Sequence, residues 1–326
     1  MKNYIFCDPD LFSGKNVNNS LGNKLLHIFF VINLANKKNM KPVLPKNNII
    51  NQLFEINDKY LFNFDHKYTQ QYIYKNIECK YRENSAFSYY NSKNIYEHYL
   101  KKILTKFNSK TKNLKLSIEQ SRKQYHEARN FFESENINKN FYVKGHFFSY
   151  SLMPKKEVLF DYINIKKDMI DNLKKKFPDC ENEDTLCIHF RATDYQGHLG
   201  EFFNKGIKLP KSYYINALEK INYKNFQKIY CLSDDLYEFR EMLKDVKYFD
   251  KLHFVDNNSS IEDWLMIFLC KNIIQSNSSF CWTASLFNKV KTIQPSNGYN
   301  FYDNSANSSI PYDFIFKNSQ TINFSS

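Results

Sequence analysis

The chain has 326 residues, which exceeds the usual size of a single hydrophobic core and predicts two domains of comparable size. Hydrophobic residues make up 42% and aromatic residues 17%, and this composition excludes an intrinsically disordered protein. The formal net charge of +12 favours an anionic partner. Because the lysines are scattered along the whole chain, nucleic acid is disfavoured, whereas an anionic membrane surface or a small anionic substrate such as a sugar nucleotide fits.

The seven cysteines form no CxxC pair and no Cys/His ligand spacing, so we expect neither a zinc site nor a disulfide framework. Cys187, Cys231 and Cys270 lie within apolar runs, which is typical of buried thiols in a reducing compartment. The start, MKNYIFCDPD, lacks the apolar region of a signal peptide, and the apolar stretch at 25–34 is too short to span a bilayer. We therefore expect a cytoplasmic protein, or one bound peripherally at the inner membrane face.

In chain order, the first predicted helix begins near Gly22 or Asn23, with Ser20 as a possible N-cap and apolar residues at helical spacing over 25–32. The preceding loop, SGKNVNNS, leads into free backbone N–H groups at a helix N-terminus, which suit a phosphate or a sugar hydroxyl. An ordinary capped core helix explains the same pattern. Residues 41–45 (KPVLP) then predict a short strand.

Residues 46–140 are rich in Asn, Lys and Tyr, with helical periods around 95–107 and 116–132. We expect a mostly helical insertion that shapes an acceptor site. A strand over 141–143 and an aromatic loop follow. His146 in that loop is either a ligand contact or a structural histidine.

From residue 165 onward, helices and strands alternate. A helix over 165–177 ends at Pro178, strands are predicted at 185–190, 228–232, 252–255, 273–275 and 291–293, and helices at 211–220, 236–243, 261–270 and 280–289. Strands joined by single helices form βαβ units, so the C-terminal half is predicted to be a Rossmann-like parallel sheet. The polar residues that end its strands then share one edge, where α/β proteins bind ligands.

The stretch TLCIHFRATDY (185–195) brings the most polar chemistry to that edge. Its apolar run ends in His189, Arg191 and Asp194. The planar guanidinium of Arg191 can hold a pyrophosphate bidentately, although an ion pair with Asp194 explains the arginine equally well. His189 lies on the same strand face, so the two residues could act together.

Three further groups at strand ends are candidates. The SNSS turn (276–279) offers hydroxyls and a positive helix end to a phosphate. Asp263 could accept N1–H and the exocyclic amine of guanine, or it could stabilise the first turn of its helix. Asp234 and Asp235 resemble a metal pair, but helix capping explains them better.

The loop QGHLGEFFNKG (196–206) follows the Arg191 stretch and contains His198 and Glu201. A glycosyl acceptor hydroxyl needs a base within hydrogen-bonding reach, and either residue could be that base.

These segments resemble those of the α-1,2-fucosyltransferases, a glycosyltransferase family 11-like group that is distantly related to the α-1,6- and protein O-fucosyltransferases. HFRATDY (189–195) is similar to the family's His-x-Arg-Arg-x-Asp-Tyr motif. SLGNK (20–24) resembles its Gly-Leu-Gly-Asn-Gln segment, and GHFFS (145–149) resembles its Gly-Tyr-Phe-Gln-Ser segment. SDD (233–235) and EDWLMIFLCKNIIQSNSSFCW (262–282) also look like family blocks, and all five occur in family order.

The resemblance implies an α/β fold of the GT-B type, with two Rossmann-type domains that face a cleft. We place an acceptor-side domain with the helical insertion at 1–165 and a domain that binds the nucleotide sugar at 166–326. The resemblance also implies GDP-fucose as the donor, inversion at the anomeric carbon, and no metal or other cofactor. The partners are then the nucleotide-sugar donor and a glycan acceptor.

By resemblance, Arg191 binds the pyrophosphate with His189 beside it, and Asp263 recognises guanine. The remaining predicted donor-binding residues are Gly22, Asn23, Asp194, Asp234, Ser278 and Ser279. The related α-1,6 enzymes carry a catalytic Glu in the loop after the motif, and Glu201 is its nearest analogue by position.

The chain departs from the family motifs at three positions: Ala192 replaces the second Arg, Thr193 replaces a Gly, and Lys24 replaces the early Gln. Our hypothesis is an inverting fucosyltransferase of α-1,2 linkage. The alternatives are a glycosyltransferase of the same fold that uses another nucleotide sugar, and a catalytically silent nucleotide- or glycan-binding protein.

Overall fold

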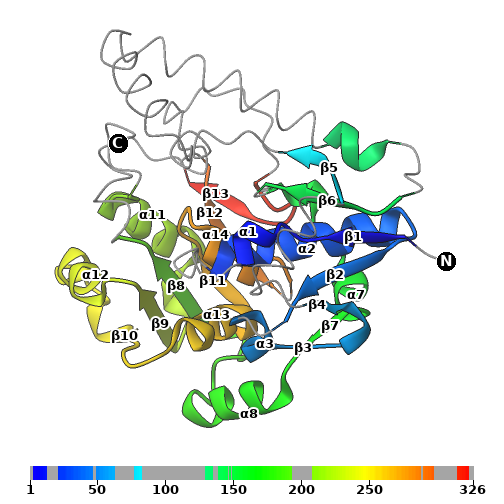
Figure 1. Ribbon diagram of the computed structural model, residues 1–326. Helices are drawn as coiled ribbons and strands as arrows, with labels where there is room; N and C mark the ends of the chain where they lie inside the picture. Colours follow the sequence, from blue (N-terminus) through cyan, green and yellow to red (C-terminus); the bar gives the residue numbers. More distant parts are fainter. Residues whose placement is uncertain are drawn as a thin grey trace, which may run out of the picture.

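The computed structural model describes residues 3–12, 21–46, 49–62, 77–82, 129–134, 139–145, 147, 149–192, 208–287, 289–296 and 314–322. These residues form two parallel sheets, one from each half of the chain (Figure 1). The first sheet has the strand order β4-β2-β1-β6-β5, and the second has the order β10-β9-β8-β11-β12-β13. The predicted α/β architecture with two Rossmann-type halves is therefore confirmed.

The N-terminal sheet is built from short strands whose neighbours all run parallel. Its strands are β1 (Tyr4–Phe6), β2 (Lys41–Pro45), β4 (Leu61–Phe62), β5 (Glu78–Arg82) and β6 (Phe141–Lys144). The helices of this half are α1 (Pro9–Phe12), α2 (Leu21–Lys37) and α3 (Ile49–Leu53). Two further strands, β3 (Phe54–Ile56) and β7 (Ile163–Ile165), pair antiparallel outside this sheet.

The C-terminal sheet follows the predicted alternation, and all of its neighbouring strands are parallel. Its strands are β8 (Thr185–Phe190), β9 (Lys228–Ser233), β10 (Leu252–Phe254), β11 (Asn272–Ile274), β12 (Lys291–Pro295) and β13 (Gln320–Ile322). The helices of this half are α8 (Lys167–Lys176), α11 (Lys211–Ile221), α12 (Leu236–Leu243), α13 (Ser260–Leu269) and α14 (Ser279–Ala284). Helix α7 (Lys156–Phe160) precedes them and packs against α2 and β7.

The two faces of the C-terminal sheet belong to different hydrophobic cores, because successive side chains of a strand point to opposite faces. On β8, Ile188 and Phe190 pack with α11 and α12, whereas Cys187 belongs to a core that also contains α13 and α14. His189 and Arg191 have the same parity as Cys187, so they share the α13/α14 side, as predicted from their spacing. Ala192 is completely buried on the opposite side.

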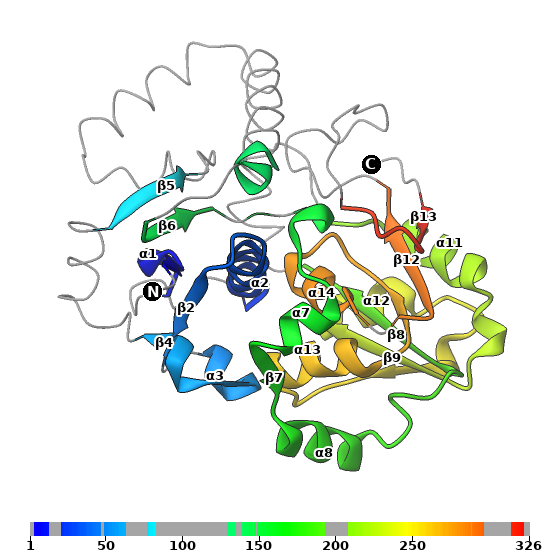
Figure 2. The same ribbon diagram turned by 90° about the vertical axis from the view of Figure 1, so that its right-hand side faces the viewer.

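Helix α2 joins the two halves. It is buried on nearly all sides, which explains why apolar residues occur around the whole helix and not only along one face. It lies between the two sheets and packs against α14 (Figure 2). The core that contains α2 also includes residues from β1, β6, α13 and the inner face of the C-terminal sheet. The two halves therefore share one interior.

The end of one predicted helix is corrected. The helix predicted over 280–289 ends at Ala284, because the backbone of the C-cap residue Ser285 has left the helical region (φ −95°, ψ 0°). Beyond it, Lys289 donates to carbonyls at the end of α13, including that of Phe268. The described parts of 46–140 contain the short strands β3, β4 and β5 besides α3 and the helical residues 129–133. Most of this range lies outside the described residues, so the mostly helical insertion stays a prediction. Strand β13 was not predicted.

The helical period at 95–107 and most of the one at 116–132 fall outside the described residues. None of the described helices is both long and apolar enough to cross a membrane.

Candidate active site

Arg191 follows the last residue of β8 and is anchored to the neighbouring strand. Its Nη1 lies 3.2 Å from Oδ2 of Asp234, which follows β9, while Oδ1 of the same carboxylate accepts the backbone N–H of Ala192 at 2.9 Å. Asp194, the alternative partner considered for Arg191, lies outside the described residues. The Arg191 side chain keeps 24% of its surface exposed, so the guanidinium is fixed in direction and still reachable by an anion.

His189 is the second polar group of β8, and it is buried. Its Nδ1 lies 2.7 Å from Ser276 Oγ, at the end of β11, and its ring stacks on Phe280 with centroids 5.5 Å apart. Burial lowers the pKa of His189 to about 3; the Asp234 carboxylate opposes this shift and the Arg191 guanidinium adds to it. The imidazole is therefore neutral at physiological pH and can exchange hydrogen bonds with a ligand without carrying charge.

The first turn of α2 meets the first turn of α14 beside His189. Asn23 Oδ1 accepts a hydrogen bond from Ser279 Oγ at 2.7 Å, and a Cβ added to Gly22 would come within 2.3 Å of the Phe280 backbone nitrogen. Ser278 is the N-cap of α14 and accepts the Phe280 N–H. The predicted phosphate turn is therefore in direct contact with the predicted Gly22 and Asn23 segment.

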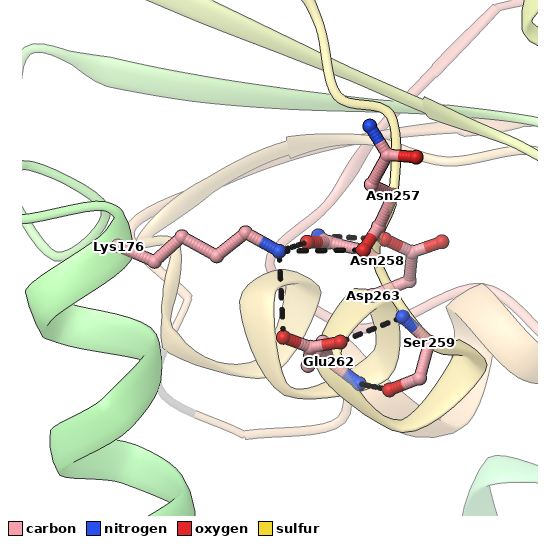
Figure 3. Close-up of polar contacts among 6 residues, drawn as sticks. All are labelled: Lys176, Asn257, Asn258, Ser259, Glu262 and Asp263. Carbon is pink, nitrogen blue, oxygen red and sulfur yellow. Dashed lines mark hydrogen bonds and ion pairs between the residues drawn. The ribbon is translucent and has the colours of Figure 1, made fainter.

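Asp263 lies in the first turn of α13, after the loop that follows β10 (Figure 3). Its Oδ1 accepts a hydrogen bond from Asn258 Nδ2 at 3.0 Å. Burial raises the pKa of Asp263 to about 6, against the lowering effect of the Asn258 hydrogen bond. The helix start is formed by Ser259 and Glu262, which make a capping box, so Asp263 is not needed as the cap.

The pair Asp234 and Asp235 has two separate structural tasks. Asp234 pairs with Arg191, and Asp235 is the N-cap of α12, where its Oδ1 accepts the Glu238 N–H at 2.8 Å. Within the described ranges, no cluster of three or more His, Cys, Asp or Glu side chains has the geometry to hold a metal ion.

The predicted residues thus form one continuous group and one separate group. Phe280 links the Arg191, His189 and Asp234 set to the α2–α14 contact, because it stacks on His189 and touches Gly22. Among the described residues, Asp263 makes no hydrogen bond or ion pair with that group, although the two helices α13 and α14 pack together. The remaining candidates, Asp194, His198, Glu201 and His146, lie outside the described residues.

Sequence reasoning missed Ser276 as a partner of His189, and it missed Asn258 and Lys176 beside Asp263. Ser276 comes just after β11, so the rule that polar residues at strand ends meet at one edge would have found it. Lys176 is on α8, more than eighty residues before Asn258, and no local pattern connects them.

A parallel sheet whose carboxyl edge holds an anchored arginine, a neutral histidine and a mostly buried carboxylate is typical of enzymes that bind a nucleotide-linked substrate. The sequence profile of glycosyl transferase family 11 matches residues 112–317, which is more than half of the chain. The chain belongs to glycosyl transferase family 11, and the resemblance of its motifs to that family is confirmed. It is a glycosyltransferase.

Several solved fucosyltransferase structures are similar to this chain at low identity. NodZ α-1,6-fucosyltransferase soaked with GDP-fucose is 12% identical, with a TM-score of 0.45 over 88% of this chain and 92% of that chain. NodZ from Bradyrhizobium is 13% identical, with a TM-score of 0.45 over 87% and 93% of the two chains. POFUT1 in complex with GDP-fucose is 13% identical, with a TM-score of 0.43 over 87% and 93%. No curated protein sequence matches the chain.

Proposed function

We propose that this glycosyltransferase moves fucose from GDP-fucose to a hydroxyl of an acceptor glycan, with inversion and in α-1,2 linkage. Residues 166–326 bind the donor, and residues 1–165 contribute the acceptor side. The observation that carries the proposal is the Arg191 guanidinium, which Asp234 anchors at the carboxyl end of β8 while it remains partly exposed beside neutral His189. Family membership supports the reaction class.

Arg191 holds the pyrophosphate of the donor and neutralises the charge that develops on the leaving phosphate. A guanidinium stays charged at every physiological pH and forms two parallel hydrogen bonds with a phosphate. Asp234 fixes its direction, so little reorganisation is needed during the reaction. The role predicted for Asp234 therefore becomes that of a positioning residue.

His189 contributes a neutral hydrogen-bonding group next to this arginine. Ser276 fixes the ring by its contact with Nδ1, and Nε2 is the atom left to face a donor oxygen. Gly22 and Asn23 approach the same place from the N-terminal half, together with Ser278 and Ser279 of α14. The donor phosphates thus lie where the two halves meet.

In the transfer step, the acceptor oxygen attacks the anomeric carbon as the bond from that carbon to the β-phosphate oxygen breaks. GDP leaves with the electron pair, and the acceptor proton passes to a base. We propose Glu201 or His198 as that base, because both belong to the loop that follows the Arg191 motif.

Asp263 recognises the guanine of the donor. A carboxylate offers two acceptor oxygens to N1–H and the exocyclic amine of guanine, a pair of donors that adenine and uracil lack. Asp263 is a suitable group because it is mostly shielded from water, which strengthens each hydrogen bond that it makes.

The first prediction concerns the choice of nucleotide. Titration calorimetry should show GDP binding about 10–100-fold tighter than UDP or ADP, because a hydrogen bond to a charged group contributes about 1.5–3 kcal/mol. Asp263→Asn should abolish this preference. Asp245→Asn is the matched control, because that carboxylate is 73% exposed and, among the described residues, forms an ion pair with Lys211 alone, at 3.5 Å.

Equal affinity of the wild type for the three nucleotides would exclude the GDP-fucose assignment. A preference for GDP without any transfer or hydrolysis of GDP-fucose would instead favour a catalytically silent binding protein.

The second prediction concerns metals. EDTA should leave the transfer rate unchanged, because Arg191 supplies the positive charge that a divalent ion would otherwise bring to the pyrophosphate. The rate is measured with GDP-fucose before and after dialysis against EDTA. Strong inhibition that Mg²⁺ or Mn²⁺ reverses would make Asp234 and Asp235 metal ligands instead.

A further inference from the structure

The Asp263 carboxylate has few partners among the described residues. Its Oδ1 accepts one hydrogen bond, from Asn258 Nδ2 at 3.0 Å. Among the residues that the structure describes, this is the only hydrogen bond to its side chain. The other lone pairs of the carboxylate are not used by these residues, so the orientation of the group depends on Asn258.

The other polar atom of the Asn258 side chain, Oδ1, is held by Lys176. This oxygen accepts a short hydrogen bond from the Lys176 ammonium, which also lies 3.5 Å from the Asn257 carbonyl oxygen (Figure 3). An ammonium can only donate and a carboxylate can only accept. One orientation of the Asn258 amide satisfies both neighbours: the oxygen points to Lys176 and the nitrogen points to Asp263.

Lys176 connects this amide to a separate helix. It is the last residue of α8, and its Nζ also lies 3.4 Å from Glu262 Oε1, while Glu262 Oε2 accepts the Ser259 N–H at 2.7 Å. Helix α8 packs against α13. The loop that precedes α13 and the first turn of that helix are therefore tied to α8 through one ammonium group.

We propose that Lys176 and Asn258 are positioning residues for guanine recognition: together they orient the Asp263 carboxylate toward the purine edge of the donor nucleotide. The inference rests on the proposed function, because it assumes that Asp263 binds guanine. Neither residue touches the ligand. Lys176 sets the direction of the Asn258 amide, and the amide sets the direction of the carboxylate.

The same contacts keep the carboxylate charged. Burial raises the pKa of Asp263, the Asn258 hydrogen bond and the Lys176 charge lower it, and the Glu262 charge on the same helix raises it. A protonated Asp263 would present a hydroxyl donor to guanine donors, and binding would weaken. Loss of Asn258 or Lys176 should therefore move the loss of guanine binding to higher pH.

The test is calorimetry of GDP and of inosine diphosphate, which lacks the exocyclic amine, between pH 5 and pH 8. The variants are Asn258→Ala, Asn258→Asp and Lys176→Met. Asn258→Asp has nearly the same shape and can still accept from Lys176, but it cannot donate to Asp263. Lys174→Met is the matched control, because Lys174 belongs to the same helix and pairs with Glu181 at 2.6 Å.

In the wild type, GDP affinity should fall as the pH drops through about 6, the pKa of Asp263. In both Asn258 variants, the affinity for GDP at pH 7 should be lower by a factor of about ten or more. The midpoint of the fall in GDP affinity should also move to higher pH. Lys176→Met should shift the midpoint in the same direction by less. Lys174→Met should match the wild type. A phosphate also titrates near pH 6, so the pH profile of Asp263→Asn is subtracted as the baseline.

A merely structural role would weaken GDP at every pH without moving the midpoint, and equal midpoints in the wild type, Asn258→Ala and Lys176→Met would overturn the inference. In that case a retained preference for GDP over UDP would leave the proposed function standing. If GDP shows no preference, the proposed function fails and the inference fails with it. The pKa of the Asp263 carboxyl in the ligand-free protein can be followed by ¹³C NMR. This measurement tests the effect of Lys176 and Asn258 on Asp263 even in a variant that binds no nucleotide.

Discussion

Replacing Arg191 by alanine is expected to lower kcat/KM with GDP-fucose by about 10²–10³-fold, the typical effect of removing one preorganised group that stabilises transition-state charge. The reason is that the lost guanidinium is the group aimed at the leaving phosphate. The free energy of unfolding should fall by only about 1 kcal/mol, because both side chains of the pair with Asp234 are partly exposed.

Two variants sharpen this experiment. Arg191→Lys keeps the charge but loses the two-pronged geometry, so its activity should lie between those of the wild type and the alanine variant. Arg240→Ala is the control: Arg240 belongs to α12, which packs on the face of the C-terminal sheet opposite to α13 and α14, and its guanidinium lies 4.7 Å from the Phe254 ring centroid. Full activity of Arg191→Ala would remove this residue from the mechanism.

Replacing Gly22 by alanine should damage both stability and donor binding. The new Cβ would lie 2.3 Å from the Phe280 nitrogen and 2.5 Å from the Ser279 carbonyl carbon, and both are backbone atoms that cannot rotate away. Helix α2 must then shift from α14, at a cost of about 3 kcal/mol, the upper part of the usual range for overpacking. Urea unfolding and GDP calorimetry measure the two effects.

Asn36→Ala is the matched control for the glycine variant. Asn36 is exposed near the end of the same helix, so its replacement should change the free energy of unfolding by less than about 0.5 kcal/mol. Wild-type stability and GDP affinity in Gly22→Ala would contradict the close α2–α14 contact.

The C-terminal half could be predicted closely from the sequence, because each βα unit carries its own local pattern. The strand expected at 185–190 is β8, with the same bounds, since six buried residues end sharply at a charged cluster. The end predicted for the helix at 280–289 was wrong, because Leu286 and Phe287 continue the apolar spacing after the backbone has left the helix. Periodicity reports burial, and burial continues past the helix end.

The N-terminal sheet was harder to predict because its strands are short and their partners are distant. Strand β1 has only three residues and pairs with β6, more than 130 residues later, so no local pattern indicates this pairing. The candidate site likewise combines a local signal with a distant one. The sequence predicted that Arg191 ends a strand, but its ion pair with Asp234, just after the neighbouring strand β9, depends on the order of the strands in the sheet.

The fit of α2 against α14 also limits how the enzyme can open for its donor. Gly22 brings the two backbones so close that no side chain fits between the first turns of α2 and α14, and the hydrophobic core on either side of this contact is continuous. Separating the two halves at α2 would therefore expose apolar surface to water and break the hydrogen bond between Ser279 and Asn23.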